Sequence, residues 1–178
     1  TIDAYRDLPG ITHLEFNYPE HLQGYDLEEI RQHMGNLGVN GVALRFRANE
    51  FMEGEFTGTD REVSRQSVEL CKKAADACQA LGGQVITIWL GFDGFDYPFQ
   101  VDYEKNWNII VRSFQEIADY AGEKGLKVSI EYKPCEPRAF SMIDGIGLTL
   151  QMIDEVDRPN IGVTLDFCHM LMKRENPA

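Results

Sequence analysis

The sequence predicts an α/β fold with a parallel sheet, namely a (β/α) TIM-barrel segment that contains about strands two to six of eight. Runs of β-forming residues alternate with helical patterns along the whole chain, and most runs alternate apolar with polar residues. Strands that are separated by helices are joined by crossovers and therefore lie parallel. Strands covered by helices on both faces would be continuously apolar, so the alternation favours a barrel over an open doubly wound sheet.

Five strands and four helices are expected. The strand candidates are 11–17, 41–47, 84–90, 127–133 and 160–166. The helix candidates are 26–36, 60–81, 102–123 and 143–156. Asp60 and Asp102 are good N-cap residues for two of these helices, and Gly82-Gly83 ends the earlier one.

Each strand candidate directs its apolar residues to one face and its polar residues to the other. The apolar members are Leu14, Phe16, Val42, Leu44, Phe46, Ile86, Ile88, Leu90, Ile130, Tyr132, Val163 and Leu165. The opposing members are His13, Glu15, Asn17, Arg45, Arg47, Thr87, Trp89, Ser129, Glu131, Lys133, Thr164 and Asp166. One face therefore packs under the helices, and the other faces a shared polar interior.

Five strands are too few to close an eight-stranded barrel. We therefore expect residues 1–178 to be a single, incomplete TIM-barrel domain from the middle of a longer protein. A flavodoxin-like five-stranded sheet is the alternative fold. An open barrel leaves two sheet edges and an apolar surface uncovered, so pairing with the missing strands or self-association as a homo-oligomer is expected.

Composition limits the partners and the compartment. The 178 residues carry a net charge of −12, which disfavours nucleic acid, and no apolar run reaches the ~20 residues of a membrane span. Cys71 and Cys78 lie on one helix candidate about 10 Å apart, whereas a disulfide needs Cα atoms within about 7 Å. Free thiols indicate a reducing compartment, and we expect the cytoplasm.

Two charged segments follow neighbouring strand candidates, where an α/β barrel places its chemistry. Glu131 and Lys133 share one face of a strand, and Glu136 and Arg138 follow them beyond Pro134. A buried ion pair of Glu131 with Lys133 is the structural interpretation. So many charges at one strand end are costly to desolvate, which favours a functional role.

Asp166 and His169 form an Asp-x-x-His pair after the next strand candidate. Carboxylate and imidazole groups together suit Mn, Zn, Co or Fe, whereas Mg prefers oxygen alone. A lone histidine is usually structural, and His21 and His33 are expected on the surface. His169 differs because an inward aspartate precedes it and the neighbouring strand carries Glu131.

The segment 87–99 follows a strand and is rich in glycine, aromatic residues and acids. Aromatic faces such as Trp89 pack against the C–H side of sugars, and acids bind sugar hydroxyl groups, which would make a sugar pocket. The alternative is a structural loop that packs its aromatic residues on its own barrel.

The segment Glu131-Tyr132-Lys133-Pro134-Cys135-Glu136-Pro137-Arg138 resembles the Glu-Pro-Lys-Pro-Asn-Glu-Pro-Arg stretch of xylose isomerases. With the alternating strands and the Asp-x-x-His pair, it resembles the xylose-isomerase-like TIM-barrel superfamily of sugar isomerases and epimerases. Two departures are Tyr132, where that stretch has proline, and Asp166, where xylose isomerases have glutamate and ketose epimerases have aspartate. Ligands from the last strands of that family are absent from these residues.

The resemblance implies that Glu131 and Asp166 bind a divalent metal, most simply Mn²⁺, with Mg²⁺, Co²⁺ or Zn²⁺ as alternatives. It implies that Glu131 and Lys133 are catalytic and that His169 binds the metal or the substrate. We expect the substrate-binding residues to be His169, Trp89, Glu136 and Arg138.

The leading hypothesis is a divalent-metal-dependent sugar isomerase or epimerase that acts on a hydroxy-carbonyl sugar, through either proton transfer or a hydride shift. One alternative is an endonuclease-like phosphodiester hydrolase of the same superfamily, which the charge of −12 disfavours. Others are a metal-dependent lyase on oxidised glycosides and a non-enzymatic assembly partner. The isolated 178 residues are expected to be inactive.

Overall fold

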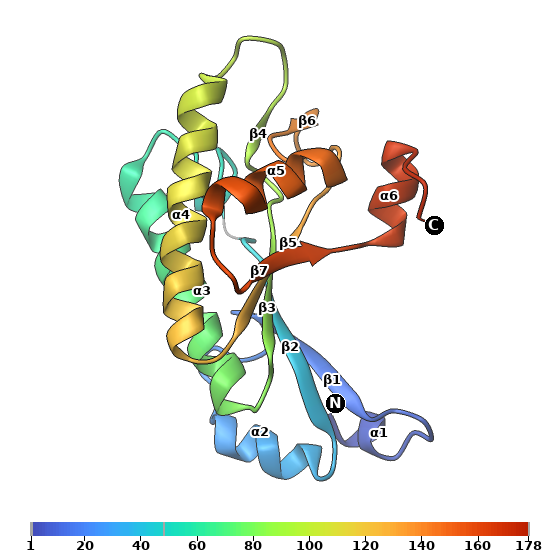
Figure 1. Cartoon of the computed structure of the whole chain (residues 1–178). Helices are drawn as coiled ribbons and strands as arrows, with labels where there is room; N and C mark the ends of the chain where they lie inside the picture. The colour runs from blue at the N-terminus through green and yellow to red at the C-terminus, as the bar shows by residue number, and fades with distance from the viewer. Residues whose placement is uncertain (1, 48, 178) are drawn as a thin grey trace.

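In the computed structural model, which describes residues 2–47 and 49–177, five parallel strands form one sheet (Figure 1). They are β1 (His13–Tyr18), β2 (Gly38–Leu44), β3 (Val85–Trp89), β5 (Lys127–Glu131) and β7 (Ile161–Thr164). The order across the sheet, β1-β2-β3-β5-β7, follows the chain. A flavodoxin-like sheet would change direction at a switch point, so the partial-barrel prediction is confirmed and that alternative is wrong.

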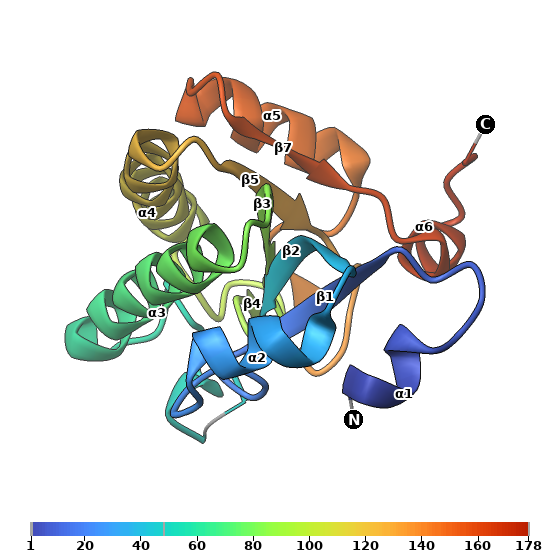
Figure 2. The ribbon, with the colours of Figure 1, turned by 90° about the horizontal axis from the view of Figure 1, so that it is seen from below.

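The four predicted helices lie outside this sheet and curve around it (Figure 2). They are α2 (Leu27–Met34), α3 (Arg61–Ala80), α4 (Tyr103–Glu123) and α5 (Ile146–Val156). Both predicted caps are present, because Asp60 accepts a hydrogen bond from the Glu62 amide at 2.8 Å and Asp102 accepts one from Lys105 at 3.0 Å. Gly82, at φ 78°, follows the end of α3.

The structure also contains short elements that were not predicted. They are α1 (Ile2–Arg6), the 3₁₀ helix η1 (Asn49–Phe51), the antiparallel pair β4 (Gly94–Phe95) and β6 (Phe140–Ser141), and α6 (Phe167–Lys173). Strand ends differ as well: β2 lies three residues earlier than predicted, and β5 ends two residues earlier. Pairing with both neighbours sets the end of β2, since its ladders to β1 and β3 both stop at Leu44.

The core lies between the helices and the outer face of the sheet. Its strand residues include Val42, Ile86, Ile88 and Ile130, all fully buried as the alternation predicts. Leu165 is a correction: β7 ends at Thr164, so this leucine leaves the sheet and is 50% exposed. All four cysteines are free, in agreement with the sequence.

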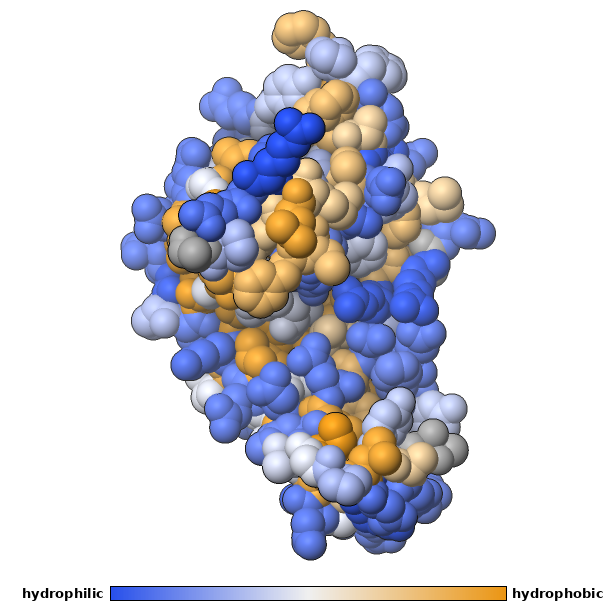
Figure 3. All heavy atoms as spheres, turned by 90° about the vertical axis from the view of Figure 1, so that its right-hand side faces the viewer, coloured by the Kyte–Doolittle hydropathy of each residue, from blue (hydrophilic) through white to orange (hydrophobic). Residues whose placement is uncertain are grey.

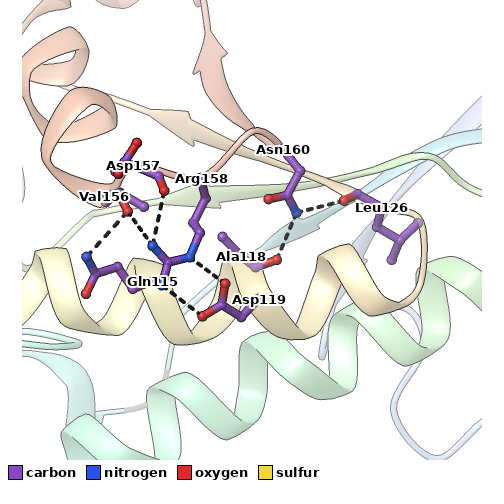
Figure 4. A network of polar contacts seen from close by, with 8 residues as sticks. All are labelled: Gln115, Ala118, Asp119, Leu126, Val156, Asp157, Arg158 and Asn160. Atoms are coloured by element: carbon purple, nitrogen blue, oxygen red, sulfur yellow. Dashed lines mark hydrogen bonds and ion pairs between the residues drawn. The ribbon is translucent and has the colours of Figure 1, made fainter.

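Polar contacts fix the turn from α5 into β7 (Figure 4). The Arg158 guanidinium donates to both carboxylate oxygens of Asp119 on α4. Asn160 Nδ2 donates to the carbonyl oxygens of Ala118 at 2.8 Å and Leu126 at 3.1 Å. These bonds hold β7 in its position beside β5.

The inner face of the sheet carries polar side chains: Ser129 Oγ and Thr164 Oγ1 lie 2.6 Å apart across β5 and β7. The side of the molecule that carries α6 shows gathered apolar side chains in its upper middle part (Figure 3). Four large apolar side chains in or beside α6 are more than two-fifths exposed: Leu165, Phe167, Leu171 and Met172. Among the described residues, no helix is long and apolar enough to cross a membrane.

Candidate metal centre

Glu131, Asp166 and His169 converge at the carboxyl ends of β5 and β7. Glu131 is the last residue of β5, Asp166 lies two residues beyond β7, and His169 lies in the first turn of α6. One ligand atom from each residue lies within 4.8 Å of the other two. The two strand ends therefore place both carboxylates at the same mouth, as the barrel prediction required.

Asp166 is held in place by the helix that it starts. Its Oδ1 accepts hydrogen bonds from the amides of Cys168 at 2.7 Å and His169 at 3.2 Å, which makes it the N-cap of α6. The cap satisfies backbone donors that would otherwise lack partners. Because the cap uses only Oδ1, Oδ2 remains available to a cation, and the same helix brings His169 to the site.

Glu131 is buried, and a guanidinium and an imidazole group lie near its carboxylate. Its Oε2 lies 3.9 Å from Arg45 Nη1, and its Oε1 lies 3.9 Å from His169 Nδ1. Burial raises the pKa of Glu131, while Arg45 and His169 lower it, and the nearby acids Asp166 and Glu15 raise it further. Both contacts are longer than hydrogen bonds, so the buried carboxylate is incompletely compensated.

Two buried polar atoms of this site have no hydrogen-bond partner among the described residues: Trp89 Nε1 and His169 Nδ1. Buried polar atoms are normally satisfied, and exceptions mark places where an ion, water or ligand belongs. Two carboxylates and one imidazole suit Mn²⁺, Co²⁺, Zn²⁺ or Fe²⁺. The residues present therefore fit a divalent cation, with Glu131, Asp166 and His169 as its candidate ligands.

The triad opens into a cavity of about 480 Å³. Its other lining residues are Asn17, Arg45, Arg47 and Trp89. The Arg45 guanidinium lies 5.6 Å from the Trp89 ring centroid, and Lys133 Nζ lies 5.8 Å from it. The sequence placed Asn17 and Arg45 on the inward face but assigned them no role, so their polar alternation was the available signal.

Three other predicted site residues, Lys133, Glu136 and Arg138, are not among the residues that line the cavity. Lys133 does not form the ion pair with Glu131 that the shared-face interpretation suggested; its Nζ lies 3.7 Å from Glu136 Oε2 instead. The physical reason is that β5 ends at Glu131, so the two-residue repeat no longer holds at Lys133. Arg138 is not among the residues that line the cavity; its Nη2 lies 3.3 Å from Asp96 Oδ2.

The two acids of the loop after β3, Asp93 and Asp96, have structural roles. Asp93 is 1% exposed and accepts hydrogen bonds from the amides of Phe56 and Thr57. Its carboxylate is therefore not available to a sugar hydroxyl group, and the expectation that this acid binds sugar is wrong. Asp96, in turn, accepts from the Ala139 amide at 3.1 Å. Both acids hold loops together.

Comparison with known proteins matches residues 2–178 to the family described as xylose isomerase-like TIM barrel. The crystal structure of D-allulose 3-epimerase from Methylomonas sp. in complex with D-allulose is 26% identical, with a TM-score of 0.76. D-Psicose 3-epimerase from Clostridium cellulolyticum H10, solved with D-tagatose, is 20% identical, with a TM-score of 0.76. The IolI protein, solved with a zinc atom, is 16% identical, with a TM-score of 0.70.

These matches cover most of this chain but only part of the other chains. They span 96%, 94% and 92% of this chain, and 56%, 57% and 56% of the three structures in the same order. The chain thus spans a little over half the length of the structures that it resembles.

Proposed function

Because this chain belongs to the xylose isomerase-like TIM-barrel family, we propose that it forms part of a metal-dependent sugar epimerase acting on a ketose. The observation that carries the proposal is the convergence of Glu131, Asp166 and His169 within 4.8 Å in a polar cavity. The names of the matched 3-epimerases support the reaction and the substrate class. The bound metal would act as a Lewis acid on the sugar carbonyl and the neighbouring hydroxyl group.

In the proposed reaction, Glu131 removes the proton from the hydroxyl-bearing carbon next to the carbonyl. Its position supports this role, because it is a buried carboxylate that lines the cavity and carboxylates can act as general bases. Return of a proton to the opposite face of the enediolate inverts that carbon and needs a second acid, which these residues do not provide. Lys133 would instead assist a hydride shift, in which no proton exchanges with solvent.

We assign sugar contacts to the residues around the cavity. The Trp89 ring would pack against the C–H face of the sugar, and its unpartnered Nε1 would donate to a hydroxyl group. His169 supplies a further polar group of the cavity lining, whereas Glu136 lies outside that lining and pairs with Lys133, so it is a weaker candidate. Arg138 is a weaker candidate, because Asp96 and the Met52 carbonyl oxygen already engage its guanidinium.

Completion of the barrel is part of the proposal. The described sheet has β1 and β7 as its edges, and all three candidate ligands come from the β5–β7 side. A cation held from one side only fills its shell with water and binds weakly. We propose that missing barrel strands, or a second copy in a homo-oligomer, complete the site, and that residues 1–178 alone do not turn over sugar.

The test uses the complete barrel that contains these residues. Purified protein is assayed for metal content and for 3-epimerisation of a ketose panel in D₂O, beside Glu131→Gln and an exposed control, Glu28→Gln. We expect deuterium in the product and loss of turnover by more than about 100-fold in Glu131→Gln only. A deuterium-free aldose product would instead favour aldose–ketose isomerisation by a hydride shift. Full activity of Glu131→Gln, or of a monomer of residues 1–178, would contradict the proposal.

A further inference from the structure

Two carboxyl groups that the proposed chemistry does not use are buried beside the candidate site. Glu55, in the connection between β2 and α3, is 0% exposed, and Asp93, in the connection after β3, is 1% exposed. Within the part of the chain that the structure describes, no ion pair joins either carboxyl to a cation. Buried acids without a cation are costly, so their arrangement requires a physical explanation.

The two acids bind each other's loops. Glu55 Oε1 accepts hydrogen bonds from the amides of Gly91 and Phe92, both at 2.9 Å. In the opposite direction, Asp93 Oδ1 accepts from the amide and the hydroxyl group of Thr57, at 2.8 and 2.6 Å. The exchange is reciprocal: each loop supplies one carboxyl and receives the other.

The backbone of these loops is also anchored from outside. Ser67 Oγ on α3 donates to the Glu55 carbonyl oxygen at 2.6 Å, and the Met142 amide donates to the Asp93 carbonyl oxygen at 3.0 Å. The titratable group that faces Glu55 from α3 is Cys71, whose pKa is raised by burial, so it brings no charge. Burial, and then the charge of Asp93, raise the pKa of Glu55 well above its ordinary value.

Gly91 connects this pair to the cavity. An added Cβ at Gly91 would lie 2.6 Å from Trp89 Cζ3, so the glycine backbone lies directly against the indole ring. Glu55 holds the amide of this same glycine. Trp89, with Arg45 over its ring, forms one wall of the cavity. The position of the indole therefore depends on a backbone segment that Glu55 fixes.

We propose that Glu55 and Asp93 together act as a clasp between the two loops, with Glu55 as a positioning residue for the Trp89 wall. The inference rests on the proposed function only in treating Trp89 as a wall of the substrate site.

The test needs neither metal nor sugar, so its failure is distinct from failure of the proposed function. In a Trp107→Phe background Trp89 is the sole tryptophan, and its emission and acrylamide quenching report the position of the indole. Glu55→Gln keeps a side-chain oxygen that can accept from the Gly91 amide. Glu55→Ala removes this acceptor, and Glu53→Gln is an exposed control in the same loop.

Because the pKa of Glu55 is raised by burial in the folded state, stability should fall as pH rises from the ordinary carboxyl range towards that raised pKa. We expect Glu55→Gln to keep the Trp89 emission and to lose this contribution to the pH dependence of the Tm. We expect Glu55→Ala to lower the Tm by roughly 5–10 °C and to make Trp89 more accessible to quencher. Glu55→Gln behaving like Glu55→Ala would refute the role of the side-chain acceptor at position 55. Unchanged Trp89 quenching in Glu55→Ala would refute the positioning role.

Discussion

Asp166 has two separable roles, and the pair Asp166→Asn and Asp166→Ala distinguishes them. One oxygen caps α6 through the amides of Cys168 and His169, and the carboxylate is also a candidate metal ligand. Asparagine is as good an N-cap as aspartate, whereas alanine loses the cap at a cost of about 1 kcal/mol. For a chain of this size, that cost lowers the Tm by about 2–4 °C. Asn should therefore leave the Tm nearly unchanged, and Ala should not.

Metal binding should weaken in both variants. The ligand atoms of the three residues lie within 4.8 Å of one another. Two unit charges at that separation interact by about 3.5 kcal/mol at an effective dielectric constant of about 20. A divalent ion held between these ligand atoms carries twice the charge and lies closer than 4.8 Å to Asp166, so its attraction to Asp166 is at least about 7 kcal/mol on the same scale. Partial compensation by water or the amide oxygen leaves a net loss of about 2–3.5 kcal/mol, or about 30- to 300-fold in Kd.

Calorimetric titration with Mn²⁺ and thermal melts monitored by circular dichroism measure the two effects on the same samples. Asp154→Asn, an exposed change on α5, is the matched control and should bind metal like the unchanged chain. Unchanged Mn²⁺ affinity in Asp166→Asn would remove Asp166 from the ligand set. An equal decrease of the Tm in Asp166→Asn and Asp166→Ala would show that the side-chain cap does not stabilise α6.

Three further changes test the packing. Phe114→Ala empties a fully buried site against Phe56, whose ring centroid lies 5.9 Å away, and should cost about 3–5 kcal/mol in urea unfolding. Gly91→Ala forces a Cβ against the Trp89 ring and should cost about 1–3 kcal/mol, with a change in Trp89 quenching. Gly147→Ala, in α5 with no heavy atom near its added Cβ, should instead stabilise by about 0.5–1 kcal/mol. The free energy of unfolding should fall in Gly91→Ala and rise in Gly147→Ala, and a change of the same sign in both would contradict this account of the packing.

The positions of site residues in the fold were predictable where a rule that holds along the local sequence also holds in the folded structure. Alternation along the strand identified Glu131 as an inward residue, and adjacency of β5 and β7 then brought it close to Asp166, which lies just beyond β7. The caps at Asp60 and Asp102 needed only local sequence. These features follow from the two-residue strand repeat and from the hydrogen-bonding needs of helix ends.

Other placements depend on information that local rules do not contain. The two-residue repeat would have put Lys133 beside Glu131, but it applies only while the strand continues, and β5 ends at Glu131. Arg45 reaches Glu131 from β2 across the intervening β3, so its contact depends on sheet register and curvature. The seven-residue α6 is too short to be predicted from its own propensity and depends on its Asp166 cap.

The environment of Glu131 favours a functional role over a structural one. A buried carboxylate kept only for stability would be expected within hydrogen-bonding distance of a basic side chain, because a buried charge is otherwise costly. Here Arg45 and His169 each remain 3.9 Å away, and the buried His169 Nδ1 has no partner in the described chain. Such incompletely satisfied groups persist where stability is exchanged for activity. A cation bound by Glu131, Asp166 and His169 would satisfy all three at once, which is why the same atoms that weaken the apo fold are the ones assigned to the metal.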